Sequence, residues 1–185
     1  RTMHWITATL RLPVLEIPRR EAASAISQRL RHYARTKVRD AFFTGERPTG
    51  FGIERIVFTY LDYLLALGAH DEFPADPGFV FVYRNSIEHF FPQFADREQA
   101  HWDRVGPEDP ELHWLGNLAL VSVGANSKFS NNLPENKVRF QETITQSTKL
   151  QLMAQLATRE RLWDLDAIRD HQSYMVELLK SDLTG

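Results

Sequence analysis

Two short apolar runs, each attached to a distinctive polar group, constrain the fold of this chain more than any other feature. The first run, Ser86–Gln93 (SIEHFFPQ), carries a Glu-His pair, and the second, Gly116–Leu120 (GNLAL), opens with Gly-Asn. A polar segment, Asn126–Asn131 (NSKFSN), then leads toward a helix. The nine residues from Asn117 to Asn126 are enough for a short strand and a turn, so the pattern predicts two strands followed by a helix.

The polar residues of these segments suit the hydrolysis of a phosphodiester. A neutral histidine such as His89 can accept a proton from water near pH 7. Carboxylate and amide oxygens, available from Glu88 and Asn126, can hold a hard divalent cation that neutralises phosphate charge. Asn117 is better suited to fixing its loop, through a side-chain amide that bonds backbone groups.

In this order, the motifs resemble the ββα-metal nucleases, also called His-Me finger or HNH nucleases. They are similar to the HNH-type domain that ends the GmrSD-type modification-dependent restriction enzymes and to phosphorothioate-sensing SspE-like defence proteins. The resemblance covers residues 85–139 and extends to the flanking helices. It implies that Glu88 is a metal ligand, His89 the general base, Asn117 a structural asparagine of the catalytic motif and Asn126 a metal ligand.

The resemblance also implies an α+β, mainly helical fold, in which helices pack before and after a ββα-metal core. Its strands would span 87–89 and 118–122, and its helix would begin near Ala125 or Asn126. We expect one HNH-type nuclease domain, the C-terminal part of a larger protein. Its expected parts are a helical lead-in (1–78), the finger (79–140, with an insertion at 93–115 whose first half is partly helical) and closing helices (141–185).

Apolar residues at helical spacing predict further helices outside the finger. These are Glu21–Phe43, Ile53–Leu67, Lys137–Leu156 and Leu165–Leu179. Gly68 is the expected end of the second helix, and Asp164 the expected N-cap of the last. Phe79–Tyr83 is a strand-like apolar run whose partner the sequence does not identify.

The Glu-His pair sets a geometric condition. Adjacent strand residues point to opposite faces, so Glu88 and His89 can share one site only if the strand ends or bends there. Pro92 favours such an ending, because proline cannot donate to a strand ladder.

Other interpretations of these residues stay open. Glu88 could form a surface salt bridge, and Asn126 could be a turn or cap residue, with Asn131 and Asn132 as competing ligands. The remaining histidines are expected to be hydrogen-bonded core or surface residues: His4, His32, His70, His101, His113 and His171.

Charge is distributed unevenly along the chain. Residues 1–60 carry eleven Lys or Arg against five acids, whereas residues 61–185 carry eleven against nineteen. A basic stripe at Arg19–Arg39 is a possible phosphate-tracking surface or, equally, a solvated helix face. The candidate nucleic-acid contacts are Arg29, Arg31, Arg35, Lys128 and Lys137, each with solvation as the alternative.

Composition excludes several classes. With no cysteine among 185 residues, the chain has no disulfide framework and no cysteine-based zinc site, which is compatible with the cytoplasmic location that we expect. No run of about eighteen apolar residues exists, so we expect no membrane partner. The first residues lack a signal-peptide pattern and do not begin with Met, which favours a fragment of a longer chain.

Together with the resemblance, which implies DNA as the substrate and restriction as the role, these features predict a metal-dependent DNA endonuclease or nickase of an antiphage restriction system. Its cofactor would be one divalent metal, Mg²⁺ or alternatively Mn²⁺. The resemblance implies its partners, which would be foreign double-stranded DNA and an N-terminal NTPase or sensor domain of the same protein. The alternatives are a non-catalytic nucleic-acid-binding or dimerisation module and a ribonuclease, because the same His and metal can cleave RNA.

Overall fold

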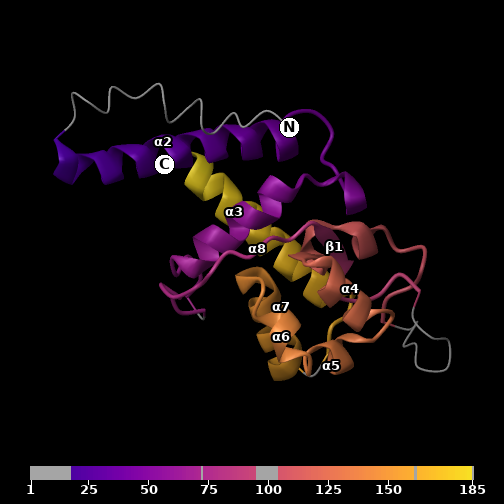
Figure 1. Ribbon diagram of the computed structural model, residues 1–185. Coiled ribbons are helices and arrows are strands. Elements are labelled where there is room, and N and C mark those ends of the chain that lie inside the picture. Colours follow the sequence, from indigo (N-terminus) through magenta and orange to yellow (C-terminus); the bar gives the residue numbers. More distant parts are fainter. Residues whose placement is uncertain (1–17, 72, 95–103, 161, 185) are drawn as a thin grey trace. The chain divides into compact units, whose positions relative to one another are not determined.

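Figure 1 shows the computed structural model of the chain. The residues that it describes are 18–71, 73–94, 104–160 and 162–184. The chain divides into two compact units, Arg1–Arg47 and Pro48–Gly185. Helix α2 (Arg19–Phe42) belongs to the first unit, and the other described helices and strands belong to the second. The boundary therefore falls inside the expected lead-in, between its two predicted helices.

The second unit contains the predicted order of two strands and a helix. Strand β1 (Ser86–His89) pairs antiparallel with β2 (Leu118–Val121), and helix α4 (Val123–Phe129) follows directly. The helix begins two residues before Ala125, because the hydroxyl of Ser122 accepts a hydrogen bond from the Ala125 N–H at 3.3 Å and caps it. The prediction of a mainly helical α+β fold is confirmed.

Three longer helices complete the second unit: the first two pack against β2, and the third packs against the loop before β2 (Figure 1). They are α3 (Arg55–Ala66), α7 (Thr148–Glu160) and α8 (Leu165–Thr184). Gly68 follows the end of α3 with a φ of +81°, a conformation that glycine adopts without strain. Asp164 caps α8, since its carboxylate accepts a hydrogen bond from the Ala167 N–H at 2.9 Å. Both expectations from the sequence are confirmed.

The predicted helix Lys137–Leu156 is wrong as one continuous element. The structure divides it into α5 (Pro134–Lys137), α6 (Gln141–Ile144) and the first part of α7. The hydroxyl of Ser147 accepts a hydrogen bond from the Leu150 N–H at 3.1 Å and so starts α7 afresh. The buried carboxylate of Asp62 also holds this start, because its Oδ1 accepts from the Lys149 N–H at 2.8 Å.

Two further predictions concern the segments around β1. Phe79–Tyr83 is not a strand: its backbone pairs with no strand in the part of the chain that the structure describes, and Tyr83 is 79% exposed. The expected helical half of the insertion falls largely on residues 95–103, outside the described residues. Its second half holds two short 3-10 turns, η2 (Pro110–His113) and η3 (Leu115–Asn117), which lead into β2.

An apolar core lies behind the two strands. Phe90 and Phe91, which follow β1, pack in one buried cluster with Leu112, Ala119 and Trp163. Lys149 enters this interior from α7 and donates to the Leu118 carbonyl at 2.7 Å. Among the described residues, no helix combines the length and the apolarity needed to cross a membrane.

The packing around Gly116 explains why the Gly-Asn motif has a glycine. A Cβ at this position would lie 2.4 Å from the carbonyl oxygen of Ile168 on α8, closer than any side chain tolerates. The close approach lets the Gly116 N–H donate to the Gln172 side chain at 2.6 Å. A glycine here therefore brings the loop before β2 directly onto α8.

Candidate functional site

Three of the predicted site residues meet in one cleft of the second unit. Glu88 and His89 from β1 and Asn126 from α4 line a cavity of about 300 Å³. Strand β1 ends at His89, so two adjacent residues reach the same cleft, as the sequence required. Asn126 is tied to the strand by its Nδ2, which donates to the Ser86 hydroxyl at 2.6 Å.

His89 is held by a second histidine. Its Nε2 lies 3.2 Å from Nδ1 of His113, and Gln93 Nε2 lies 3.3 Å from that same His113 nitrogen. Phe51 packs edge-on against the His89 ring, with centroids 5.7 Å apart. Burial, followed by the nearby His113 and Lys137, lowers the pKa of His89 to about 3. The imidazole is therefore neutral at pH 7, and one of its two ring nitrogens can accept a proton.

Glu88 forms a buried ion pair. The Lys137 ammonium donates to Glu88 Oε1 at 2.6 Å and to the backbone carbonyl of His89, and its side chain is fully buried. Burial raises the pKa of Glu88 and lowers the pKa of Lys137, and their mutual attraction offsets part of each shift. Any cation that Glu88 binds must compete with this ammonium.

Asn117 lies behind the cleft and bonds backbone groups, as its sequence context led us to expect. Its Oδ1 accepts from the Phe91 N–H at 2.8 Å, and its Nδ2 donates to the carbonyls of Phe91 at 3.0 Å and Leu112 at 2.9 Å. The indole of Trp163 also donates to its Oδ1, at 3.1 Å. One buried amide thus holds the chain that leaves β1 against the chain that enters β2.

The oxygens of the cleft fit a hard divalent ion better than a zinc-type ion. Within the described ranges, no three His, Cys, Asp or Glu side chains are grouped to hold a metal. The Glu88 carboxylate and the Asn126 amide are oxygen donors of the kind that Mg²⁺ accepts, and Mg²⁺ commonly keeps several waters. Asn131 lines the same cleft and stays an alternative ligand, whereas Asn132 donates to the Phe129 carbonyl at 2.8 Å.

Comparison with known proteins places the chain in a family. The family model of the C-terminal domain of GmrSD restriction endonucleases matches residues 29–178. The chain belongs to this family. Membership of the GmrSD C-terminal domains makes it a nuclease domain of the restriction-endonuclease type. No curated protein and no solved structure matches the chain.

Trp163, just before the closing helix α8, and Arg169, on that helix, both contact the loops around the cleft of this GmrSD C-terminal domain. Trp163 bonds the motif residue Asn117, as described above. Arg169 donates from Nη2 to Glu111 Oε1 at 2.8 Å and so ties α8 to η2. Glu111 and His113 lie on the same turn, η2. The Trp163–Asn117 and Arg169–Glu111 hydrogen bonds therefore both hold the loop that carries His113.

The proposed DNA contacts of this GmrSD C-terminal domain are in different environments. The prediction that Lys137 contacts DNA is wrong, because its side chain is fully buried against Glu88 and cannot reach a phosphate. Lys128 is exposed and pairs with Glu142 at 3.1 Å. Arg29 is exposed on α2, and Arg31 and Arg35 are half-buried there. The arginines belong to the first unit, and the cleft belongs to the second.

Two residues of the cleft region were missed by the sequence analysis. The sequence predicts that His113 is a hydrogen-bonded core or surface residue, and the structure shows that its partner is the His89 ring. Its place three residues before Gly116 was the only available signal. Arg55, the exposed first residue of α3, also lines the cleft and brings a positive charge beside Glu88 and Asn126. No sequence motif connects it to β1.

Proposed function

We propose that this GmrSD C-terminal domain is a metal-dependent DNA endonuclease or nickase of an antiphage restriction system. One observation carries the proposal: Glu88, His89 and Asn126 line a single polar cleft, which Arg55 also borders. These residue types supply a proton acceptor, oxygen ligands and a phosphate-binding cation, which phosphodiester hydrolysis needs.

His89 would take the proton from the attacking water. We assign the proton between the two histidine rings to His89 Nε2, which donates to His113 Nδ1 and leaves Nδ1 of His89 as the base. His113 then fixes the tautomer and the orientation of His89. A pKa of about 3 makes the ring a poor proton acceptor in the free protein. A phosphate anion in the cleft would raise this pKa, because it opposes the effects of burial and of Lys137.

Glu88 and Asn126 would hold one Mg²⁺, or Mn²⁺, in the cleft. When bound, such an ion neutralises phosphate charge and acidifies its bound water. Arg55 would contact a non-bridging phosphate oxygen, because it is exposed and borders the same cleft. By the same proposal, the substrate is foreign double-stranded DNA, the site of action is the cytoplasm, and an NTPase or sensor domain of the same protein controls cleavage.

Plasmid nicking tests metal dependence directly. We expect supercoiled plasmid to become open-circular or linear with Mg²⁺ or Mn²⁺ and to stay intact with EDTA, because Glu88 and Asn126 offer oxygen ligands of the kind that these ions accept. Excess Mg²⁺ added after EDTA should restore cleavage. Equal cleavage in both conditions would contradict the metal proposal, and an RNA substrate in the same assay tests the ribonuclease alternative.

A non-catalytic nucleic-acid-binding or dimerisation module is the second candidate. The observation that favours it is the Glu88–Lys137 pair, which gives the carboxylate a structural role of its own. Intact plasmid under every metal condition, combined with binding of DNA by the same preparation, would support this candidate over the nuclease.

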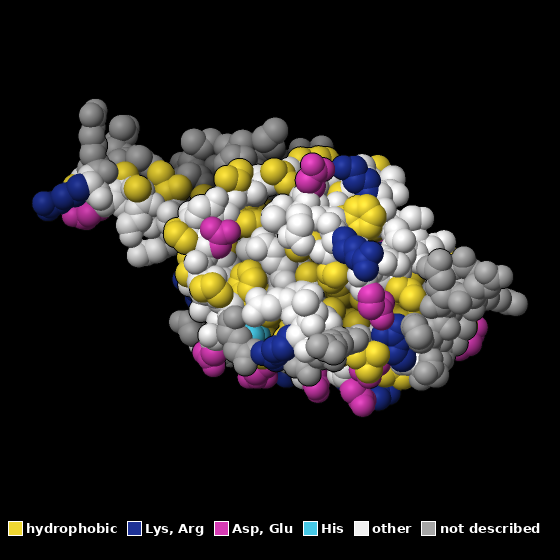
Figure 2. All heavy atoms as spheres, turned by 90° about the horizontal axis from the view of Figure 1, so that it is seen from below, with side chains coloured by type: hydrophobic (Ala, Val, Ile, Leu, Met, Phe, Trp, Pro, Cys, Tyr) yellow, Lys and Arg dark blue, Asp and Glu magenta, His cyan; other side chains and the backbone are white. Residues whose placement is uncertain are grey.

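DNA binding by the isolated chain is expected to be weak and largely independent of sequence. In the view of Figure 2, basic and acidic side chains are interspersed and do not form one basic tract. Phosphate contacts by α2 would carry most of the affinity. We expect the Arg29→Ala, Arg31→Ala, Arg35→Ala triple variant to flatten the dependence of log K on log salt, measured by fluorescence anisotropy.

Arg55→Ala is the matched comparison, because it removes one cation at the cleft. Its salt slope is expected to fall by about one unit, the effect of losing a single phosphate contact. An unchanged slope in the triple variant would instead assign α2 to a solvated face or to a docking surface for another domain.

A further inference from the structure

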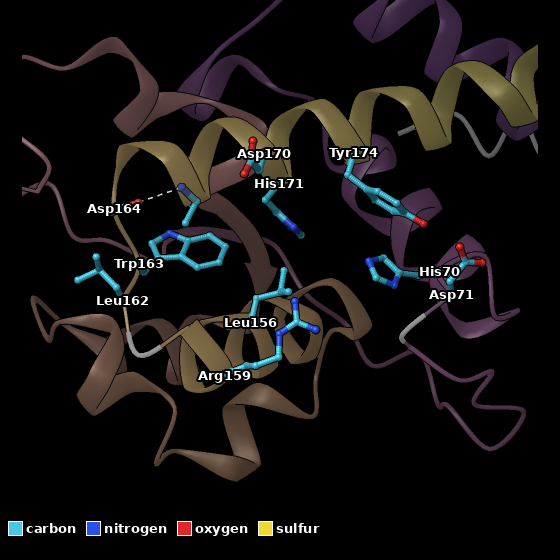
Figure 3. A pocket seen from close by; sticks show the side chains of 11 residues that line it. His70, Asp71, Leu156, Arg159, Leu162, Trp163, Asp164, Asp170, His171 and Tyr174 are labelled. Carbon is cyan, nitrogen blue, oxygen red and sulfur yellow. Dashed lines mark hydrogen bonds between the residues drawn. The ribbon is translucent and has the colours of Figure 1, made fainter.

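A second pocket, larger than the cleft, is separate from the proposed nuclease chemistry. It has a volume of about 600 Å³, within the range of small-molecule sites, and shares no lining residue with the cleft. Figure 3 shows its walls: Leu156 and Arg159 from α7, His171 and Tyr174 from α8, and His70 from the loop after α3. Nothing in the proposed function uses these residues.

Ring systems dominate the pocket. His70 and Tyr174 face each other with centroids 4.4 Å apart, and Trp163 meets His171 edge-on at 5.7 Å. In Figure 3 the His171 ring extends from α8 into the space between Trp163 and the His70–Tyr174 pair. Flat walls of this kind favour a flat ligand, because aromatic rings stack on its faces.

A buried nitrogen of the pocket needs a partner. Among the described residues, none forms a hydrogen bond with Nε2 of His171, and this histidine is only 3% exposed. Buried polar groups are nearly always satisfied, so this nitrogen calls for a partner, such as water or a ligand atom. Burial also lowers the pKa of His171 well below its usual value, so the ring is neutral and offers one donor or one acceptor.

Charge at the pocket restricts the ligand further. Three carboxylates, Asp71, Asp164 and Asp170, line it against the single guanidinium of Arg159. This balance repels a chain of phosphates and accepts a neutral group whose N–H donors can reach a carboxylate. A planar neutral ring that carries both N–H donors and ring-nitrogen acceptors meets every condition.

We propose that this pocket binds a nucleobase, stacked against its aromatic walls and hydrogen-bonded to His171. The base could belong to a nucleic-acid strand or to a free nucleoside, since both present the same ring. One residue connects the pocket to the nuclease motif: Trp163 lines the pocket, and its indole N–H donates to Asn117 at 3.1 Å. The proposal does not depend on cleavage by His89.

Calorimetric titration of the full chain with each of the four deoxynucleosides, without added metal, tests the proposal. We expect at least one to bind with a Kd of about 1 mM or tighter, and free 2-deoxyribose not to bind. A six-nucleotide single strand of the preferred base separates the two sources. Tighter binding and competition by the strand would assign the base to nucleic acid, whereas binding of the nucleoside alone would assign it to a free nucleoside.

Two variants locate the binding. Tyr174→Leu at the rim should raise the Kd for the nucleoside about tenfold, the effect of removing one stacking ring. Tyr83→Leu, which changes an exposed tyrosine outside the pocket, should leave it unchanged. His171→Leu should abolish binding while circular dichroism shows a folded protein, and if that variant does not fold, Tyr174→Leu decides. Binding by none of the nucleosides, equal binding of 2-deoxyribose, or an unchanged Kd in Tyr174→Leu would overturn the proposal.

Discussion

His89→Ala is expected to cleave plasmid DNA about 10²- to 10⁴-fold more slowly than the natural chain, because loss of a general base typically costs this much. The measurement is the single-turnover nicking rate at saturating Mg²⁺ and excess protein. A structural role for His89 would not give this result, since binding and folding would change with the rate. A variant that cuts at the natural rate would remove His89 from the role of base.

His113→Ala is the companion variant. His113 acts on His89 through one hydrogen bond of 3.2 Å and would not itself receive the proton, so we expect a smaller loss of rate. Circular dichroism and DNA anisotropy on both variants provide the control, because each should stay folded and bind DNA as the natural chain does. If His113→Ala loses as much cleavage rate as His89→Ala does, His113 is more than a positioning residue, and the assignment of His89 alone as the base is wrong.

The pH dependence separates the free protein from the complex. With a pKa of about 3, His89 is already deprotonated at pH 5, so kcat/KM should show no decline near pH 6.5 caused by this residue. An anionic phosphate in the cleft raises the pKa, so the acid limb of kcat should lie at higher pH than that of kcat/KM. Coincident limbs near pH 6.5 would mean that His89 is not buried in solution as it is in the structure.

The sequence predicted the parts of the site that depend on local chemistry. The end of β1 after the Glu-His pair follows from a proline three residues on, and the start of α8 follows from the capping carboxylate of Asp164. The role of Asn117 follows from its residue type, because an asparagine amide readily bonds backbone groups, but its partner Phe91, 26 residues away, is known only from the fold.

The parts that failed depend on contacts between distant residues. Lys137 was assigned to the surface because lysine is usually solvated, and only Glu88, 49 residues away, explains its burial. His113 contacts His89 although the two lie 24 positions apart in the sequence, and no periodicity predicts such a contact. Arg55 enters the cleft because α3 packs against β2, which is a property of the folded core.

Lys137→Met is expected to lower the free energy of unfolding by about 3–5 kcal/mol at pH 7, the typical cost of removing one partner from a buried ion pair. The physical reason is that Glu88 would keep its buried position and lose the ammonium that lies 2.6 Å away. Urea denaturation measures the change. Lys128→Met is the matched control, because it breaks an exposed pair with Glu142, and exposed pairs contribute about 0–1 kcal/mol.

The loss should depend on pH with a definite sign. Burial already raises the pKa of Glu88, and removal of Lys137 takes away the attraction that lowers it. In the variant the folded state therefore binds a proton more readily than the unfolded state does, so its stability rises as pH falls toward the model-peptide range of carboxylates. We expect the gap between the variant and the natural chain to narrow between pH 7 and pH 5, and a constant gap would place the cause outside Glu88.

Metal ions turn the same variant into a test of the role of Glu88. If Glu88 is a metal ligand for which the Lys137 ammonium competes, Mn²⁺ should raise the Tm of Lys137→Met more than that of the natural chain, because the variant lacks the ammonium. Adding Glu88→Gln to Lys137→Met should recover much of the stability, since no unpaired charge is left, and should remove the extra response to Mn²⁺. If stability recovers but Mn²⁺ raises the Tm of neither variant, the Glu88–Lys137 pair has only a structural role. In that case Glu88 is not a metal ligand, and neither Asn126 nor Asn131 has a carboxylate partner for a metal.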